Sequence, residues 1–136
     1  MGKMTIALLS GGVSSEREVS LNSGNQVYDA LDKEKYNIIR YDPKTDLGRL
    51  VEDAPGIDAA LIILHGPYGE DGMIQGFLET IGIDYIGCDY QSCAMCMNKA
   101  WLKHLAISNN IDTSSFIEIC YHDWKINRED ILRKAI

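Results

Sequence analysis

Long hydrophobic runs and clusters of basic residues are both missing from this sequence of 136 residues. Its longest uninterrupted apolar run is Ala59 to Leu64, whereas a helix needs about 20 apolar residues to cross a bilayer. The formal net charge is −7, and Lys and Arg form no stripe that could follow a phosphate backbone or an anionic membrane surface. We therefore expect no nucleic acid and no membrane among its partners.

Two common nucleotide-binding fingerprints and a secretion signal are absent as well. Neither G-x-G-x-x-G nor a Walker A loop occurs. The apolar stretch near the start, MTIALL, is too short for a signal peptide and is typical of a first strand. The four cysteines, at 88, 93, 96 and 120, are therefore predicted to be reduced thiols of a cytoplasmic protein rather than a disulfide framework.

Cys93 and Cys96 form a C-x-x-C pair, which in other settings binds zinc. The remaining cysteines and histidines near this pair in the sequence have no recognised zinc spacing: Cys88, His104, Cys120 and His122. Met95 and Met97 interleave with the pair, which favours a core helix packed with small and soft side chains. We expect no metal site in the chain, and a zinc-stabilised interaction protein is kept as an alternative.

The residues that are present predict an α/β fold with a parallel sheet. With 46% hydrophobic and 24% charged residues, the chain has a globular composition, and its length suits one domain with part of a second. Apolar runs and helical periodicities alternate along the chain, the order of β-α-β units with helices on both faces of an open parallel sheet. The predicted strands are Met4–Leu9, Tyr36–Tyr41, Ala59–Leu64 and Tyr85–Ile86, and the predicted helices cover about 16–31, 74–81 and 91–98.

The first predicted helix has two informative features. Ser15 and Glu18 stand in the S-x-x-E order of a capping box, which predicts the start of the helix. Small residues early in its apolar stripe would let the helix approach a sheet closely. The stripe consists of Ser20, Ser23, Gly24, Val27 and Leu31.

The pattern changes after Asn98. We predict a helix containing Trp101 and Leu105, a strand over Phe116–Cys120, and a final helix capped by Asn127. Residues 1–97 are interpreted as one α/β domain and residues 98–136 as the truncated start of a larger one. A small carboxyl-terminal extension is the alternative.

Two polar, glycine-containing loops follow predicted strands: SGGVSSERE (10–18) and HGPYGEDG (65–72). Ligands of open parallel sheets bind at the carboxyl ends of the strands, so both loops belong to one candidate site. Glu16 at the helix start could hold a substrate ammonium group, or simply interact with the helix dipole. His65 could donate to a carboxylate, or anchor its loop. Glu70 and Asp71 are predicted to be helix-starting acids.

Three segments resemble signatures of the D-alanine–D-alanine ligase family. They are GGVSSEREVSLNSG (11–24), LHGPYGEDGMIQGFLE (64–79) and DYIGCDYQSCAMCMNKAWLK (84–103). The resemblance implies a pre-ATP-grasp, Rossmann-like substrate-binding domain in residues 1–97, then a linker helix and the start of an ATP-grasp domain. It also implies a homodimer and a reaction in which ATP, with Mg²⁺ or Mn²⁺, phosphorylates the carboxylate of one D-alanine before a second D-alanine attacks it.

Residue roles follow from the resemblance by position. Glu16 matches the catalytic glutamate that fixes the ammonium group of the first D-alanine, Val19 a residue that packs on its methyl group, and His65 a histidine near its carboxylate. Lys99 matches a lysine that approaches the ATP phosphates, although its position alone suggests a solvated helix lysine. No metal ligand is assigned.

The sequence departs from the family pattern in three places. Asn98 replaces a usual aspartate, CDYQSCAMC (88–96) replaces a run richer in serine and alanine, and TSSF (113–116) lacks the usual proline. The serine and tyrosine of the substrate network, the magnesium-binding acids and most of the ATP site are missing, so this chain alone is expected to be inactive. The alternatives are a D-alanine–D-lactate or D-alanine–D-serine ligase, and a non-catalytic α/β module that binds small molecules.

Overall fold

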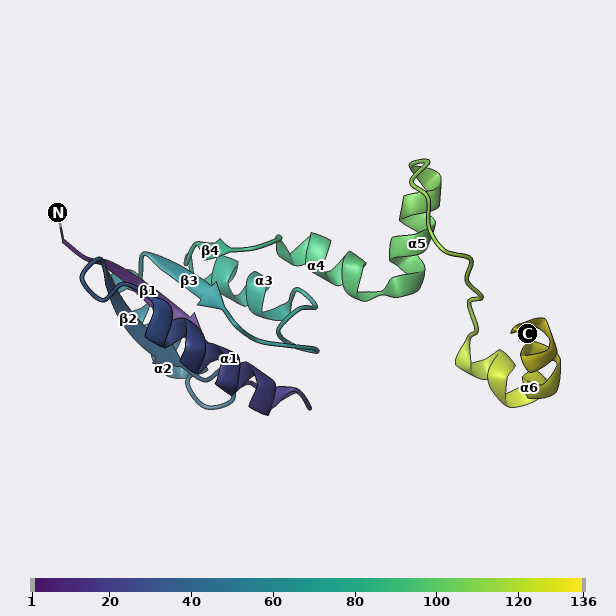
Figure 1. The fold of residues 1–136 in the computed structure, drawn as a ribbon, viewed down its shortest axis with the longest axis horizontal. Coiled ribbons are helices and arrows are strands. Elements are labelled where there is room, and N and C mark those ends of the chain that lie inside the picture. Colours follow the sequence, from purple (N-terminus) through teal and green to yellow (C-terminus); the bar gives the residue numbers. More distant parts are fainter. Residues whose placement is uncertain (1, 136) are drawn as a thin grey trace. The chain divides into compact units, whose positions relative to one another are not determined.

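The computed structural model describes residues 2–135 (Figure 1). They divide into two compact units, one ending at Met97 and one beginning at Asn98. We describe each unit by itself. The functions assigned above to these two parts of the chain stay predictions.

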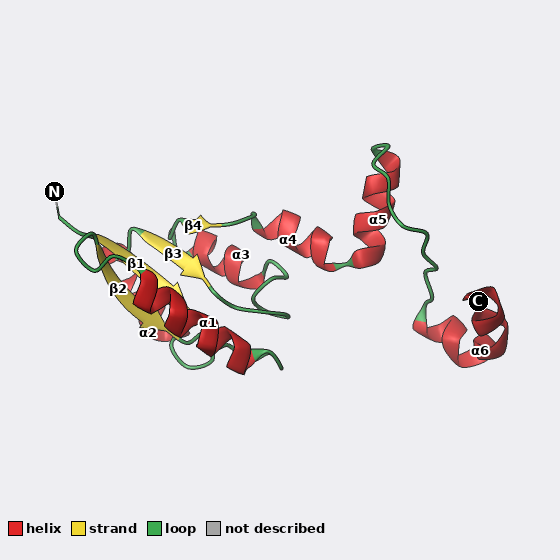
Figure 2. Ribbon diagram, in the orientation of Figure 1, coloured by secondary structure: helices red, strands yellow, loops and turns green. Residues whose placement is uncertain are grey.

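The first unit contains a four-stranded parallel sheet in the order β2-β1-β3-β4 (Figure 2). The predicted open parallel sheet is therefore confirmed. Its third strand is shorter than predicted, because the carbonyl of Ile63 accepts a hydrogen bond from the Ser20 hydroxyl instead of continuing a strand ladder. The strands are β1 (Met4–Leu9), β2 (Tyr36–Tyr41), β3 (Ala59–Ile62) and β4 (Tyr85–Ile86).

Helices cover both faces of this sheet, as predicted. Alternate residues of β1 point to opposite faces. Ala7 and Leu9 belong to one core cluster with Leu50 and Leu78 of two helices, whereas Ser10 on the opposite face meets the first helix. Figure 1 shows that first helix in front of the strands. The helices are α1 (Arg17–Ala30), α2 (Leu47–Asp53), α3 (Met73–Thr80) and α4 (Tyr90–Met97), with a short 3₁₀ turn, η1 (Ala54–Gly56).

The small-residue stripe of α1 packs as the sequence predicts. Ser20 and Gly24 are buried, and a Cβ added to Gly24 would lie only 2.5 Å from Cβ of Ser10. Real Cβ atoms do not approach this closely, so α1 sits at a distance from β1 that only glycine permits here.

The prediction of a capping box at the start of α1 is wrong. The N-cap residue is Glu16 rather than Ser15, and its side chain makes no capping hydrogen bond. The hydroxyl of Ser14 accepts the backbone N–H of Glu16 at 3.1 Å, which leaves the start of α1 tied to the preceding loop.

The prediction that α4 is a core helix is also wrong. None of its residues is buried, although Cys93 and Met95 are half-buried. All four cysteines are free thiols, as predicted. The small and soft side chains of α4 therefore cover the edge of the unit rather than fill its centre.

The second unit contains α5 (Lys99–Ser108) and α6 (Tyr121–Ala135). The side chain of Asn98 caps α5 by accepting the N–H groups of Ala100 and Trp101. The predicted strand at Phe116–Cys120 is wrong, because this segment packs on a helix instead of pairing with a strand. Nε2 of His104 in α5 lies 2.9 Å from Oε2 of Glu118, and the rings of His104 and Phe116 pack edge to face.

The predicted last helix is present. α6 consists of two helical segments that meet at Asn127, whose φ of −124° is non-helical, so the second segment begins after Asn127 as predicted and an additional helical segment from Tyr121 precedes it. Within residues 2–135, no helix is both long and apolar enough to cross a membrane.

We expect Gly24→Ala to destabilise the first unit by about 1–2 kcal/mol, although alanine is the better helix former. The added methyl group has no room against Ser10. Gly48→Ala is the matched control, because a Cβ at this α2 position meets nothing within 4 Å. Urea unfolding of both variants measures the difference, and equal stability of the two would contradict the close packing of α1.

Candidate functional site

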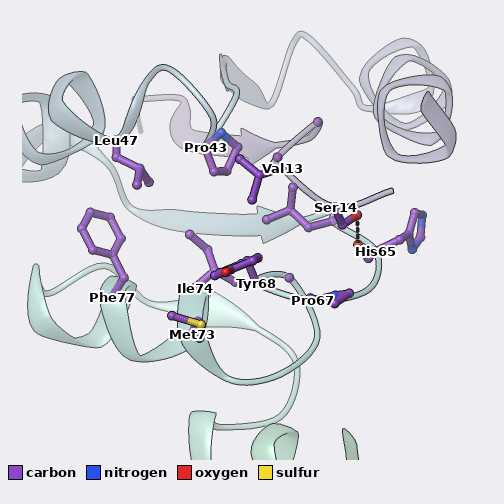
Figure 3. A pocket seen from close by; sticks show the side chains of 14 residues that line it. Val13, Ser14, Pro43, Leu47, His65, Pro67, Tyr68, Met73, Ile74 and Phe77 are labelled. Atoms are coloured by element: carbon purple, nitrogen blue, oxygen red, sulfur yellow. Dashed lines mark hydrogen bonds between the residues drawn. The ribbon is translucent and has the colours of Figure 1, made fainter. Parts of the chain in front are cut away.

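The two polar loops meet at the carboxyl ends of β1 and β3. The Ser14 hydroxyl donates to the backbone carbonyl of His65 at 2.7 Å (Figure 3). Gly66 has a φ of +70°, and a Cβ placed on it would lie 3.1 Å from Oε1 of Glu16. The carboxylate of Glu16 therefore lies beside the loop that carries His65, an arrangement that parallel strand topology predicts.

Glu16 has an exposed side chain at the amino-terminal end of α1. None of the ion pairs within residues 2–135 involves its carboxylate. A carboxylate in this position gains from the positive end of the helix dipole and can still accept hydrogen bonds from a cationic group. The geometry is compatible with both readings of Glu16.

His65 is half-buried, and its imidazole points away from the centre of the neighbouring apolar cavity (Figure 3). Its Nε2 atom is buried, and no residue in the described part of the chain forms a hydrogen bond with it. An unpaired buried polar atom is costly, so this nitrogen would gain from a polar partner. Its backbone carbonyl, meanwhile, anchors the loop.

Val19 and Lys99 lie in different surroundings. Val19 is on α1 one turn after Glu16 and is 55% exposed, which leaves its side chain available for contact. Lys99 is the first residue of α5 in the second unit and is exposed. The structure thus places Glu16 beside the loop that carries His65, with Val19 one turn further along α1, and Lys99 belongs to the other unit. Their functional roles stay predictions.

An ion pair that the sequence analysis missed holds the first loop. Nη1 of Arg17 donates to Oδ1 of Asp42 at 3.0 Å and to the carbonyl of Gly12 at 2.8 Å, while the N–H of Gly12 donates to the same carboxylate. The aspartate follows β2 at the same sheet edge, so its position after a predicted strand was the available signal. The ends of β1 and β2 are joined in this way.

The pKa of Asp42 reflects this network. Burial of the carboxyl would raise its pKa, but hydrogen bonds from Arg17 and from two backbone N–H groups outweigh burial and lower the pKa to about 2. The charged form of Asp42 is therefore part of the folded structure.

The acids of the second loop brace their own backbone. Glu70 accepts the N–H of Gly66 at 2.7 Å, and Asp71 accepts the N–H groups of Tyr68 and Met73. Because Met73 begins α3, Asp71 does act at a helix start, whereas Glu70 fixes the segment next to His65. Both carboxylates are thus already hydrogen-bonded to nearby backbone N–H groups, unlike that of Glu16.

An apolar cavity of about 310 Å³ lies next to the loops, on the face covered by α2 and α3. Leu47, Ile74 and Phe77 contribute to its wall, and neither Glu16 nor Val19 lines it. Within residues 2–135, no group of three or more His, Cys, Asp or Glu side chains is arranged to hold a metal ion. The C-x-x-C pair therefore has no further ligands in this part of the chain.

Comparison with known proteins identifies the family of the chain. The family model described as D-ala D-ala ligase N-terminus matches residues 5–51 and 45–88. The chain belongs to this family. The resemblance seen in the three sequence segments is thereby confirmed.

A D-alanine–D-alanine ligase from Syntrophobacter fumaroxidans is 60% identical over 105 residues, which are 77% of this chain and 34% of that protein. The solved D-alanine–D-alanine ligase from Bacillus anthracis complexed with ATP is 42% identical with a TM-score of 0.78, and the match covers 87% of this chain and 41% of that one. A D-Ala:D-Ser ligase from Enterococcus faecalis is 25% identical with a TM-score of 0.75 over 97% of this chain and 49% of that one.

These family members are longer than the present chain, which spans 34% to 49% of their lengths. The shared part contains β1 to β4 and both loops of the candidate site. The fold of the candidate site is thus a property of the family.

The ion pair of Asp42 predicts a specific loss of stability in acid. A pKa lowered from 3.8 to about 2 stabilises the fold above pH 3.8, and this contribution disappears as the pH falls through 2. The expected loss is about 1–2 kcal/mol. Denaturant unfolding between pH 5 and pH 2 should show it in the unaltered chain and not in Asp42→Asn. Asp112→Asn, an exposed aspartate of the second unit, should keep it; identical pH profiles for all three would contradict the assignment.

Proposed function

We propose that this chain forms the amino-terminal, substrate-binding part of an ATP-dependent ligase that joins two D-alanines for peptidoglycan precursor synthesis. The observation that carries the proposal is the meeting of the Glu16 and His65 loops in a chain of the D-alanine ligase family. An acid and an imidazole at one sheet edge suit a small zwitterion, whose ammonium and carboxylate groups lie only a few ångströms apart.

Each proposed contact uses a group that makes no hydrogen bond or ion pair with the other described residues, or a side chain that is exposed. The exposed Glu16 carboxylate would accept hydrogen bonds from the ammonium group, and the unpaired Nε2 of His65 would donate to the carboxylate. Val19, exposed one turn along α1, would contact the methyl group. Together these contacts would orient the first D-alanine and reduce the entropy cost of its reaction.

ATP would supply the phosphoryl group that activates the first carboxylate, after which the amine of the second D-alanine attacks the acyl phosphate. Lys99 is an exposed cation suited to the ATP phosphates. The described residues contain no cluster of acids for Mg²⁺ or Mn²⁺, so a longer protein would have to bind the metal elsewhere. Because ATP is made and used in the cytoplasm, we also propose a cytoplasmic location. We propose a homodimer as well, since the resemblance to the family implies one.

Glu16→Gln in a full-length ligase containing this chain should weaken binding of the first D-alanine about 10- to 100-fold, because a charge-assisted hydrogen bond contributes about 1.5–3 kcal/mol. Stability should fall by no more than about 1 kcal/mol, because Glu16 makes no ion pair with the other described residues and only its interaction with the helix dipole is lost. Glu18→Gln, another exposed acid in the first turn of α1, is the matched control. Steady-state kinetics and thermal unfolding measure both effects, and unaltered affinity in Glu16→Gln would refute the pocket.

The chain alone should catalyse neither dipeptide formation nor ATP hydrolysis, because it spans at most 49% of the family members described above. Incubation with ATP, Mg²⁺ and D-alanine tests this. Phosphate release or dipeptide above the level of a Glu16→Gln sample would show that the chain contains a complete site.

The second substrate is a separate question. The D-Ala:D-Ser ligase has the same fold in this part, with a TM-score of 0.75, so the fold alone does not indicate which second substrate is used. D-alanine, D-serine and D-lactate are the candidates. Competition among the three acceptors in the full-length enzyme would establish the preference.

A further inference from the structure

Ser14 connects the two loops through a short chain of hydrogen bonds. The backbone N–H of Glu16 donates to Oγ of Ser14 at 3.1 Å, and the same hydroxyl donates to the carbonyl of His65 at 2.7 Å. A serine hydroxyl has one proton and two lone pairs, so both bonds can form together. The backbones of the proposed acid and imidazole are therefore linked through a single side chain.

A second serine makes a parallel connection deeper in the unit. The N–H of Gly11 donates to Oγ of Ser20 at 2.8 Å, and this hydroxyl donates to the carbonyl of Ile63. Carbonyls two residues apart in an extended chain point the same way. The segment from Ile63 to His65 is thus held at two alternate carbonyls, that of Ile63 by Ser20 and that of His65 by Ser14.

The two serines differ in what depends on them. Ser20 is completely buried between α1 and the sheet, so its loss would disturb packing. Ser14 is only half-buried, and the start of α1 is independently attached to the end of β2 through Arg17 and Asp42. Loss of the Ser14 hydroxyl would leave the sheet and α1 in place and release the Glu16 side of the site from the His65 side.

We propose that Ser14 is a positioning residue that sets the separation between the Glu16 carboxylate and the His65 imidazole. This inference rests on the proposed function, because it concerns the same amino-acid pocket. Two groups that bind opposite ends of one small zwitterion must be held at a fixed spacing. A displacement of about 1 Å can cost a site up to about 100-fold in rate.

The test uses the full-length ligase containing this chain. Ser14→Ala should raise the KM for the first D-alanine on the order of 10-fold, with little change in kcat, because both contacts exist before the chemical step. Ser14→Thr, which retains the hydroxyl, should restore a KM close to that of the unaltered enzyme. Ser15→Ala is the matched control, since this neighbour is exposed and lies outside the hydrogen-bonded chain.

Amide hydrogen exchange of the unaltered chain tests the inference without relying on the folding of a variant. In the unaltered chain, the amide of Glu16 should exchange with solvent more slowly than that of an unstructured peptide, because it donates to Ser14. Unprotected exchange would overturn the inference.

The outcomes separate the inference from the proposed function. A KM for Ser14→Ala equal to that of Ser15→Ala, with affinity lost in Glu16→Gln, overturns only the role of Ser14. Unchanged affinity in Glu16→Gln overturns the pocket itself, and the positioning role with it. An increase in KM for Ser14→Ala that Ser14→Thr reverses supports both.

Discussion

The close approach of α1 to the sheet is the constraint on which the rest of the first unit depends. Gly24 allows it, because a Cβ at that position would clash with Ser10 at 2.5 Å. At this distance the Ser20 hydroxyl reaches both the N–H of Gly11 and the carbonyl of Ile63. A helix held farther out would leave these buried backbone groups without partners, at a cost of about 1–3 kcal/mol each.

The packing of α1 on the sheet fixes the positions of the two polar loops. Once α1 is seated, its first turn lies beside the loop after β3, and Arg17 reaches Asp42 after β2. The carboxyl ends of three strands are then connected by side chains rather than by longer regular structure. Such an edge can be polar, hydrogen-bonded and open to a ligand while the sheet beneath it is apolar and rigid.

The expectations that failed each relied on a local sequence pattern. Ser15 and Glu18 have capping-box spacing, yet α1 begins one residue later with Glu16 at the N-cap, and the Ser14 hydroxyl accepts the N–H of Glu16 while it donates to the carbonyl of His65. Phe116–Cys120 has strand composition, but its neighbourhood contacts α5 and has no strand beside it in the described chain. The apolar and soft residues of α4 suggested a core helix, whereas no residue of that helix is buried.

The order of the four sheet strands and of α1, α3 and α4, the two loops at the carboxyl edge and the family could be predicted from the sequence, because hydrophobic periodicity and long signatures are local properties. The helix α2 was not predicted. The separation of Glu16 from the His65 loop, the unpaired Nε2 of His65 and the ion pair of Arg17 with Asp42 were decided only by tertiary structure. The contacts of Ser14 with His65 and of Arg17 with Asp42 join residues 51 and 25 positions apart, and sequence spacing does not specify distances across crossover connections.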